Sequence, residues 1–508
     1  MNAQPNANLF SRLFDGLKDG GKTAIETHDG RLISYAELVE FAGRTANYLV
    51  SRGVKPGDRV AAQTEKSVSA LVLYLATVRA GAVYLPLNTA YTLNELDYFI
   101  TDAEPALVVC DPSKQGGIAA LADKIGARVD TMDANGDGSL REGAKNSPAE
   151  FTTVPRANDD LAAILYTSGT TGRSKGAMLT HDNLASNSFA LVDYWRFTDK
   201  DVLIHALPIY HTHGLFVASN VTLFSRATMI FLPKLDPELM IKLMDRATVM
   251  MGVPTFYTRL LQSPNLSKES TKHMRLFISG SAPLLAETHR EWSARTGHAV
   301  LERYGMTETN MNTSNPYDGE RLPGAVGFPL PGVSVRVTDP ESGKELARDD
   351  IGMIEVKGPN VFKGYWRMPE KTEAEFRPDG FFITGDLGKI DAKGYVHILG
   401  RGKDLVISGG FNVYPKEIES EIDAIPGVIE SAVIGVPHAD FGEGVTAVVV
   451  NTKDAKLDEA SVMKALDGRL AKFKMPKRVI FVDDLPRNTM GKVQKNVLRE
   501  TYKSLYAK

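Results

Sequence analysis

The sequence predicts an α/β fold, in which a large N-terminal domain of two βα-layered subdomains and a small β unit precedes a smaller α+β C-terminal domain. Three observations predict it. Up to about residue 304, apolar runs of strand length alternate with segments of helical spacing, which is typical of a mostly parallel sheet covered by helices. From residue 323 to 400 the apolar runs are short and separated by Gly, Pro and Asp, as in β units. The 508 residues, 43% of them hydrophobic, suffice for two to four domains.

The first half of the chain begins the alternation with a capped helix. Ser34 and Glu37 form a capping box, and the helix is expected to run to about Arg52, with Gly53 as its stop. The region 115–155 is interpreted as a helix plus a variable surface loop, and residues 133–138 lack the terminal Glu of a calcium loop. Further strands are predicted at 59–63, 83–86 and 107–110, and helices at 68–79 and 93–101.

The second half resumes the alternation and then changes character. Strands are predicted at 202–207, 229–232, 249–253, 276–279 and 300–304, and short β runs at 333–337, 352–356 and 395–399. The last part mixes helices near 415–425 and 460–470 with strands near 431–435 and 445–450. We therefore expect an N-terminal domain over residues 1–400 and a C-terminal domain over 401–508, joined near 401–404.

Composition and charge exclude several classes of protein. Lys and Arg number 59 against 62 Asp and Glu, so the net charge of −3 provides no general attraction to nucleic acid or anionic membranes. The single cysteine, Cys110, excludes an internal disulfide and a cysteine-ligated metal site, and it favours a reducing compartment, for which we expect the cytoplasm. Neither a signal peptide nor a membrane span is predicted.

A loop at residues 166–176, Tyr-Thr-Ser-Gly-Thr-Thr-Gly-Arg-Ser-Lys-Gly, is the strongest local signal. It lies between a predicted strand at 161–165 and a predicted helix at 181–195. Its glycines permit close approach, its hydroxyls can donate to phosphate oxygens, and Lys175 supplies a cation. The order differs from a Walker A loop, in which Gly-Lys-Ser/Thr closes the motif. The alternative is a surface turn rich in Ser, Thr and Gly.

The loop resembles the phosphate loop of the acyl-adenylate-forming superfamily, which includes acyl-CoA synthetases. Five further stretches resemble motifs of this superfamily in the same order, and the stretch 301–313 is similar to that of malonyl-CoA synthetases in particular. The five stretches are 207–214, 276–283, 304–309, 384–388 with 400–404, and 486–492.

The resemblance implies a two-step ligase that uses ATP, Mg²⁺ and coenzyme A. A carboxylate attacks the α-phosphate to give an acyl-adenylate and pyrophosphate, and the thiol of coenzyme A then displaces AMP. Such an attack on a polyanion requires charge neutralisation. The implied catalytic residues are Lys492, Glu308 as the Mg²⁺ ligand, and Thr307 and Thr167 on phosphate. The implied ATP-binding residues are Thr167, Ser168, Gly169, Thr170, Thr171, Gly172, Lys175, Gly280, Ala282, Glu302, Tyr304, Gly305, Thr307, Asp386, Arg401 and Lys492.

Within the ATP site, the resemblance implies that Asp386, assisted by Arg401, accepts hydrogen bonds from the ribose hydroxyls. It also implies that the Tyr304 ring stacks on the adenine. The acyl pocket is expected to contain Arg303, His211, Ser281 and Met306. Malonate would carry a second, ionised carboxylate into this pocket, so a fixed cation is needed, and Arg303 can receive it bidentately. The alternative is that Arg303 pairs with Glu302 or Asp318 outside the pocket.

Three histidines, His205, His211 and His213, invite a zinc site, because His211 and His213 would share one face of a strand. No carboxylate or cysteine nearby completes such a site, and the resemblance places His211 at the acyl pocket. His205 is expected to be a core residue with satisfied hydrogen bonds.

Lys492 is expected on a loop of a mobile C-terminal domain, which closes in one orientation to bring this lysine to the ATP. The resemblance places a hinge at Asp404 and implies that a second orientation brings Gly409 and Gly410 toward coenzyme A. The basic run 469–499 is either a solvated face or a surface for the phosphates of ATP or coenzyme A. A lysine acetyltransferase and a deacetylase are possible partners at Lys492, since acetylation removes its charge.

The sequence restricts which carboxylic acid can be the substrate, but more than one acid remains an alternative. Adenylation domains that activate amino acids carry an Asp near 211–214, which is missing here, and no carrier domain follows, so free coenzyme A is the expected acceptor. The favoured substrate is malonate, with methylmalonate probable in the same pocket; another short-chain or aromatic acid is the alternative. A catalytically silent ligand sensor is disfavoured by the joint presence of Lys175, Glu308, Asp386, Arg401 and Lys492.

Overall fold

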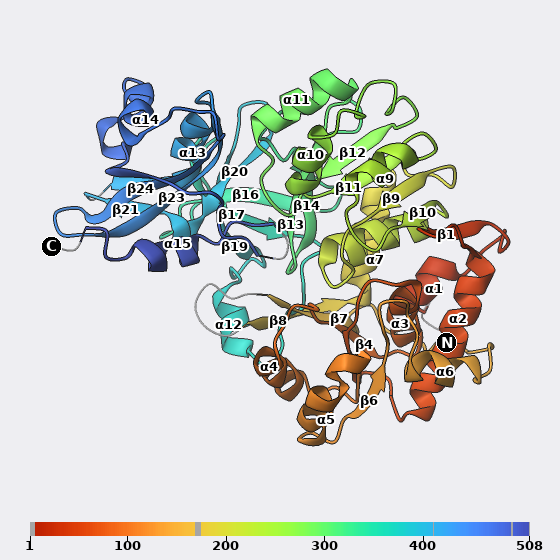
Figure 1. The fold of residues 1–508 in the computed structure, drawn as a ribbon. Coiled ribbons are helices and arrows are strands. Elements are labelled where there is room, and N and C mark those ends of the chain that lie inside the picture. Colours follow the sequence, from red (N-terminus) through yellow and green to blue (C-terminus); the bar gives the residue numbers. More distant parts are fainter. Residues whose placement is uncertain (1–5, 168–173, 410, 489–490, 507–508) are drawn as a thin grey trace.

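The computed structural model describes residues 6–167, 174–409, 411–488 and 491–506. Ser168, Gly169, Thr170, Thr171, Gly172 and Gly410, which the sequence places in the ATP and coenzyme A sites, lie outside the described residues. The described residues form four sheets, and the α/β class with a larger N-terminal and a smaller C-terminal part is confirmed (Figure 1).

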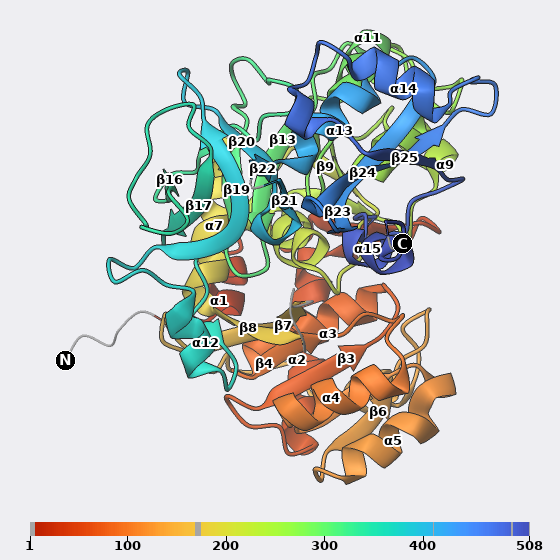
Figure 2. The ribbon, with the colours of Figure 1, turned by 90° about the vertical axis from the view of Figure 1, so that its left-hand side faces the viewer.

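The first sheet has seven strands in the order β18-β8-β7-β4-β3-β5-β6, with helices on both faces. One face packs mainly against α2, α3 and α6, and the other against α4 and α5 (Figure 2). Its elements are β3 (Arg59–Gln63), β4 (Val83–Pro86), β5 (Leu107–Cys110), β6 (Arg128–Thr131), β7 (Leu161–Thr167), β8 (Lys175–Thr180), β18 (Gly364–Tyr365), α2 (Tyr35–Ser51), α3 (Val68–Arg79), α4 (Leu93–Ala103), α5 (Gln115–Asp123) and α6 (Ser139–Lys145).

The second sheet has nine strands in the order β15-β14-β13-β12-β11-β9-β10-β1-β2. Its central strands are parallel, and their apolar residues form one continuous core with the neighbouring helices. Its elements are β1 (Thr23–Thr27), β2 (Leu32–Ser34), β9 (Val202–His205), β10 (Thr228–Phe231), β11 (Val249–Gly252), β12 (Leu276–Ser279), β13 (Leu301–Met306), β14 (Asn310–Ser314), β15 (Phe328–Pro329), α1 (Leu9–Phe14), α7 (His181–Tyr194), the π-helix η2 (His213–Ser219), α8 (Asn220–Phe224), α9 (Pro237–Leu243), α10 (Pro254–Leu261) and α11 (Ala286–Thr296).

Two smaller sheets complete the chain. The third is antiparallel and contains β16 (Ser334–Thr338), β17 (Gly352–Lys357), β19 (Phe382–Ile390) and β20 (Val396–Arg401), with α12 (Pro369–Ala374) nearby. The fourth contains β21 (Val406–Ser408), β22 (Phe411–Val413), β23 (Val428–His438), β24 (Gly442–Asn451) and β25 (Arg478–Phe481), with α13 (Pro415–Asp423), α14 (Glu459–Leu466) and α15 (Lys495–Tyr502). The short turns η1 (Pro112–Lys114), η3 (Gly402–Asp404) and η4 (Lys472–Lys474) link elements.

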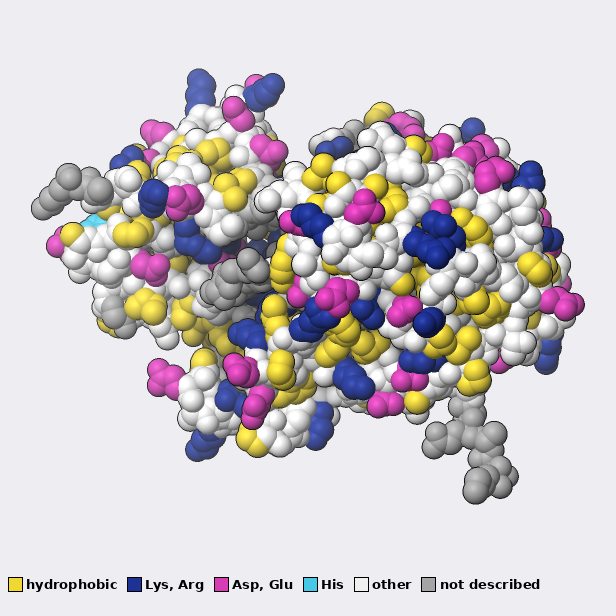
Figure 3. Space-filling view, turned by 90° about the horizontal axis from the view of Figure 1, so that it is seen from below, with side chains coloured by type: hydrophobic (Ala, Val, Ile, Leu, Met, Phe, Trp, Pro, Cys, Tyr) yellow, Lys and Arg dark blue, Asp and Glu magenta, His cyan; other side chains and the backbone are white. Residues whose placement is uncertain are grey.

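The two smaller sheets meet at η3, between the end of β20 and the start of β21. The domain division at residues 400 and 401 remains a prediction, to which this change of sheet corresponds. Seen from below, a furrow separates the smaller lobe from the larger body, and Lys and Arg side chains gather beside it (Figure 3). In the part of the chain that the structure describes, no helix is both long and apolar enough to cross a membrane.

The expected order of strand, loop and helix around residues 166–176 is wrong in one respect. The segment after the loop is not the helix but a strand, β8, which pairs antiparallel with β7 from Leu161 to Thr167. The helix α7 (His181–Tyr194) begins at His181, as predicted, and Thr180 caps it. The strands β7 and β8 form a β-hairpin, here called the phosphate hairpin after the expected role of the loop, so Lys175 stands at the start of a strand and gains nothing from a helix dipole.

Candidate active site

The two ends of the phosphate hairpin come together with a carboxylate from another sheet. Thr167, the last residue of β7, directs its Oγ1 to Glu308 Oε1 at 3.4 Å. Lys175, the first residue of β8, places its Nζ 3.0 Å from Glu375 Oε1 and 4.0 Å from the centre of the Tyr365 ring. Thr167, Lys175 and Glu308, which are far apart in the sequence, thus border one space at the edge of the first sheet.

Glu308 has the surroundings expected of a carboxylate that receives a cation. It follows β13, is only 6% exposed, and its burial raises its pKa. Its Oε1 contacts two hydroxyls, those of Thr167 and Tyr365, and it has no ion-pair partner within the described ranges. Mg²⁺ typically takes one or two protein carboxylates together with substrate phosphates, so the position of Glu308 beside the phosphate hairpin fits that ion.

The proposed ribose site joins the second and third sheets. Asp386 on β19 accepts from Arg401 Nε at 2.9 Å through one carboxylate oxygen and from the Tyr304 hydroxyl through the other. The nearby carboxylate raises the pKa of Arg401. The Asp386 backbone N–H donates to Thr384 Oγ1 at 3.0 Å, and the same hydroxyl donates to Ile354 on the neighbouring strand. These bonds fix the strand that presents Asp386.

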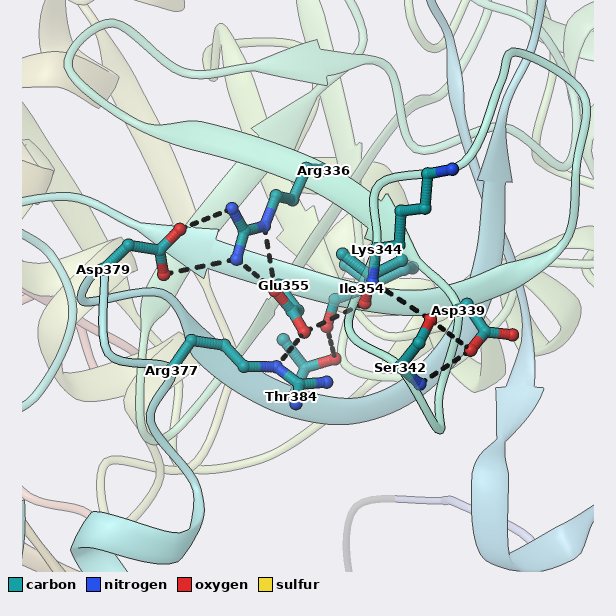
Figure 4. Close-up of polar contacts among 10 residues, drawn as sticks. Arg336, Asp339, Ser342, Lys344, Ile354, Glu355, Arg377, Asp379 and Thr384 are labelled. Carbon is teal, nitrogen blue, oxygen red and sulfur yellow. Dashed lines mark hydrogen bonds and ion pairs between the residues drawn. The ribbon is translucent and has the colours of Figure 1, made fainter.

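A buried ion cluster supports the same strand pair from behind (Figure 4). Glu355 on β17 is fully buried, and it accepts from Arg336 at 2.9 Å and from Arg377 at 2.7 Å. Arg336 also pairs with Asp379 at 2.6 Å. Arg336 lies on β16 and Arg377 in the turn that leads into β19, so Glu355 joins β17 to β16 and to that turn. Removing one partner of this buried, hydrogen-bonded charge would leave the other uncompensated.

Lys492 lies where the smaller lobe meets these residues. The loop before it touches the larger body, since a Cβ placed on Gly491 would lie 3.2 Å from Thr255 in α10. Gly491 has a φ of +73°, which few other residues adopt easily. Lys492 remains solvent-exposed, but the surrounding protein atoms and the positive charge of Arg401 lower its pKa. The charges of Arg401 and Asp386 therefore act on the Lys492 ammonium in this arrangement.

Arg303 lies in the interior of the protein with unused donors. It is 3% exposed, and its Nε and Nη2 are buried without a hydrogen-bond partner in the described structure. Burial lowers its pKa to about 9, so it stays charged at neutral pH. Neither alternative partner is bound to it: Glu302 accepts from the Gly324 N–H at 3.1 Å, and Asp318 pairs with Arg196. Glu302 and Arg303 are successive on β13 and so point to opposite faces.

Two histidines lie beside Arg303, but not as the sequence predicts. His211 precedes the π-helix η2 and His213 begins it, so they do not share a face of a strand. Burial, and then the charge of Arg303, lower the pKa of His211 to about 4, and the same causes lower the pKa of His213 well below its ordinary value, so both rings are neutral at pH 7. His213 Nδ1 lies 3.2 Å from Ser281 Oγ, and its buried Nε2 has no partner in the described part of the chain.

His205 is a core residue with satisfied hydrogen bonds, as the sequence predicts. Its Nε2 lies 3.0 Å from the Gly214 carbonyl, and its Nδ1 lies 2.9 Å from Nζ of the buried Lys66. Among the described residues no group of three or more His, Cys, Asp or Glu side chains is arranged to hold a metal ion. The three histidines therefore belong to packing and to the space around Arg303.

The other predicted residues have clear places. Gly305 packs its backbone against Asn310 O, where a Cβ would lie at 1.9 Å. Ser281 has a φ of +71°, which is a strained value for a residue other than glycine, and Ala282 follows it in the loop after β12. Met306 is the last residue of β13, and Thr307 follows it.

The residues predicted for the hinge and for coenzyme A lie in the C-terminal part of the chain. Gly409 follows β21 and lies beside Phe441, and Asp404 pairs with Arg499 at 2.8 Å.

The sequence did not indicate Tyr365, Glu375 or His213 as members of the site. Tyr365 and Glu375 flank the six-residue helix α12, about 200 residues after Lys175, and no motif or spacing in the sequence joins them to the phosphate loop. His213 stands in the stretch 207–214 with His211, but the resemblance placed only His211 at the acyl pocket.

Gly280 gives a first prediction, because Arg303 lies directly against it. A Cβ at residue 280 would lie 2.4 Å from Cζ of the buried guanidinium. Gly280→Ala should therefore displace Arg303 and raise the KM for a dicarboxylic acid by at least about tenfold, while the KM for ATP changes less. Steady-state kinetics with each substrate varied in turn measure this. Gly116→Ala, in α5 where a Cβ would have no atom within 4 Å, is the control for replacing a glycine as such; equal effects of the two variants would contradict the prediction.

Comparison with known proteins places this geometry in a family. Residues 16–366 match the AMP-binding enzyme family, and residues 417–492 match the C-terminal domain of AMP-binding enzymes. The chain belongs to the AMP-binding enzyme family. The resemblance in the motifs is thereby confirmed, as is the expectation of an acid-thiol ligase.

Members of this family with solved structures or curated functions include close relatives. ATP-bound MatB from Rhodopseudomonas palustris is 80% identical over 99% of this chain and 100% of that one, with a TM-score of 0.98. Malonate–CoA ligase of Arabidopsis thaliana is 34% identical, over 93% of this chain and 85% of that protein. Feruloyl-CoA synthase of an Amycolatopsis species is 37% identical, over 94% of this chain and 95% of that protein.

The overall arrangement of this chain is more similar to the ATP-bound structure than to the apo structure of MatB. The apo structure of the same Rhodopseudomonas palustris enzyme has a TM-score of 0.87 with this chain, against 0.98 for its ATP-bound structure. Both comparisons cover 99% of this chain at 80% identity, so the difference lies in arrangement and not in sequence. The described contact of Gly491 with Thr255 thus belongs to an arrangement like that of the ATP-bound enzyme.

Proposed function

We propose that this enzyme is an ATP-dependent malonate–CoA ligase that also accepts methylmalonate and works through an acyl-adenylate. The observation that carries the proposal is the buried guanidinium of Arg303, whose Nε and Nη2 have no partner in the described structure. A dicarboxylate is the substrate that would satisfy such a cation, because one carboxylate reacts and the other stays charged. The malonate–CoA ligase of Arabidopsis thaliana, similar over nearly the whole chain, supports this choice.

The residues of the chain divide the first step among them. Lys175 and Lys492 bring positive charge to the phosphates, Thr167 and Thr307 donate hydrogen bonds to them, and Asp386 holds the ribose with help from Arg401. Glu308 would hold Mg²⁺, which when bound shields phosphate charge. Arg303, with His213 Nε2 and Ser281 beside it, orients the acid so that its free carboxylate faces the α-phosphate. Gly280, Ala282, Glu302, Tyr304 and Gly305 border the adenine in this proposal, and Met306 and His211 the acid.

The second step uses another arrangement of the two proposed domains, residues 1–400 and 401–508. A rotation about Asp404 would withdraw Lys492 and bring Gly409 and Gly410 toward the thiol of coenzyme A. The ion pair between Asp404 and Arg499 would have to adjust in that rotation. Free coenzyme A is the acceptor, and no nucleic-acid partner is proposed.

Two regulatory and cellular proposals accompany the ligase. A lysine acetyltransferase and a deacetylase are proposed to act on Lys492, which is exposed and whose charge the first step needs. The cytoplasm is the proposed compartment, supported by the single, buried thiol of Cys110. Malonate–CoA ligases of mouse and human that resemble this chain are named mitochondrial, so cell fractionation is the test of this last point.

One assay tests the proposed function. The purified enzyme should convert ATP to AMP and pyrophosphate with malonate, and thioester should form only when coenzyme A is added. A panel of acetate, malonate, methylmalonate, succinate and ferulate, followed by AMP release, should show malonate and methylmalonate as the best substrates. Best turnover of a monocarboxylic or aromatic acid would favour the alternative ligase, and ADP with orthophosphate as products would refute the mechanism.

A further inference from the structure

A second carboxylate lies at the phosphate hairpin, and no motif accounts for it. Glu375 comes just after α12, and its Oε1 lies 3.0 Å from Lys175 Nζ and 2.9 Å from Lys371 Nζ. Its Oε2 accepts from the Tyr365 hydroxyl at 2.6 Å. The same hydroxyl lies 3.1 Å from Glu308 Oε1. We call Lys175, Tyr365, Lys371 and Glu375 the Glu375 cluster.

The position of Glu375 opposes the binding of a polyanion. Its charge neutralises Lys175, a cation at the end of the phosphate loop, and so withholds that cation from an arriving triphosphate. The pair is only partly exposed, with 16% of the Lys175 side chain and 20% of the Glu375 side chain accessible, so solvent screens it incompletely. A carboxylate with only a structural task would not need to take the lysine that phosphates require.

The other members of the cluster allow Lys175 to leave Glu375 at low cost. When Lys175 turns toward a phosphate, Glu375 keeps the ammonium of Lys371 and the hydroxyl of Tyr365, so its charge is not left unpaired. The face of the Tyr365 ring, 4.0 Å from Lys175 Nζ, stabilises the ammonium beside Glu375. Tyr365 itself is 2% exposed and fixed on β18, so it holds Glu375 in place through either state.

We propose that Glu375 is an internal counter-ion, which binds Lys175 when no nucleotide is present and competes for it with the phosphates of ATP and pyrophosphate. Glu375 is thus a positioning residue that acts through Lys175. Its competition keeps pyrophosphate affinity moderate and favours release of that product. The inference rests on the proposed use of ATP, and it concerns the balance of affinities within that site.

Direct binding tests the competition without any turnover. Calorimetric titration with magnesium pyrophosphate, and separately with magnesium ATP, is made in the absence of acid and of coenzyme A. Glu375→Gln should bind both about fivefold more tightly than the wild type, the change expected for loss of a partly exposed ion pair. Glutamine keeps the size and an acceptor for Tyr365, so the fold is preserved, and unchanged Tm values check this. Glu373→Gln, an exposed acid in the same helix, should leave both affinities unchanged.

A second background separates competition from a general effect of charge. In a Lys175→Met protein, adding Glu375→Gln should change pyrophosphate affinity by less than twofold, because there is no lysine left to compete for. A fivefold change that persists in this background, or weaker binding by Glu375→Gln alone, would overturn the counter-ion role. A wild-type protein that binds no ATP at all would overturn the proposed function itself. If the wild type binds ATP and Glu375→Gln binds ATP and pyrophosphate with the same affinities as the wild type, this inference alone is overturned.

Discussion

Replacing Arg303 with alanine is expected to lower kcat/KM for malonate by roughly 10⁴-fold while kcat/KM for acetate changes far less. Sites built around a polar partner discriminate by about that factor. In the wild type, acetate leaves the buried guanidinium unpaired, so it should be a poor substrate; in the variant, malonate instead brings an unpaired carboxylate into the same space. The malonate-to-acetate ratio of kcat/KM measures the effect directly, since losses in folding cancel from it.

Conservative changes and larger acids sharpen this test. Arg303→Lys should not restore the ratio, because an ammonium cannot form the planar fork. Methylmalonate keeps the separation of its carboxylates and should be tolerated, and succinate, longer by one methylene, should lose about 1 to 3 kcal/mol. Arg290→Ala, at an exposed arginine of α11, is the matched control. A ratio that stays at the wild-type value in Arg303→Ala would mean that another group binds the second carboxylate.

Lys492→Ala should abolish the first half-reaction and largely spare the second. The ammonium lies beside Arg401 and Asp386 in the described orientation, so its loss removes charge where the phosphates react, and a drop of at least about 10² to 10³-fold in pyrophosphate release is expected. In the second orientation the same residue would be turned away, so thioester formation from supplied malonyl-adenylate should fall by less than about threefold. Single-turnover measurements of each half-reaction distinguish the two.

A neutral lysine should behave in the same way as the alanine. Enzyme acetylated at Lys492 should lose the first half-reaction, and deacetylation should restore it, because the modification removes the charge and leaves the backbone unchanged. Lys503→Ala, at an exposed lysine paired with Glu500, is the control and should be fully active. Equal loss of both half-reactions in Lys492→Ala would refute the division of work between two orientations.

The elements most accurately predicted from the sequence are those with purely local causes. The predicted strands 59–63, 83–86, 107–110 and 276–279 coincide with β3, β4, β5 and β12. Short apolar runs bounded by turn residues are typical of buried strands, so the local sequence was enough to predict them. The helix at 34–52 is α2, with its capping box intact at Ser34 and Glu37. Pairings between distant segments could not be predicted: the parallel pairing of β1 with β10 joins residues 204 positions apart, such as Ile25 and Met229, and nothing local indicates it.

The site divides along the same line. The motifs located Thr167, Glu308, Tyr304, Asp386 and Arg401, and the structure brings these into contact in two groups. The strand β8 was missed because its first residues, Lys175 and Gly176, were assigned to the loop, and its strand form depends on partners β7 and β18 on either side. Glu375 was missed for a similar reason, since the pairing of β18 with β8 brings the segment that contains Glu375 to Lys175.

Three of the four sheets supply different parts of the site, and this has an evolutionary consequence. The histidines near Arg303 come from the segment after β9 of the second sheet, whereas Thr167 and Lys175 come from the first sheet and Asp386 from the third. Mutation in the segment after β9 can therefore alter the acid that is accepted while Thr167, Lys175 and Asp386 keep their positions. A lineage built in this way can acquire new substrates by small steps, each of which retains a working adenylation reaction.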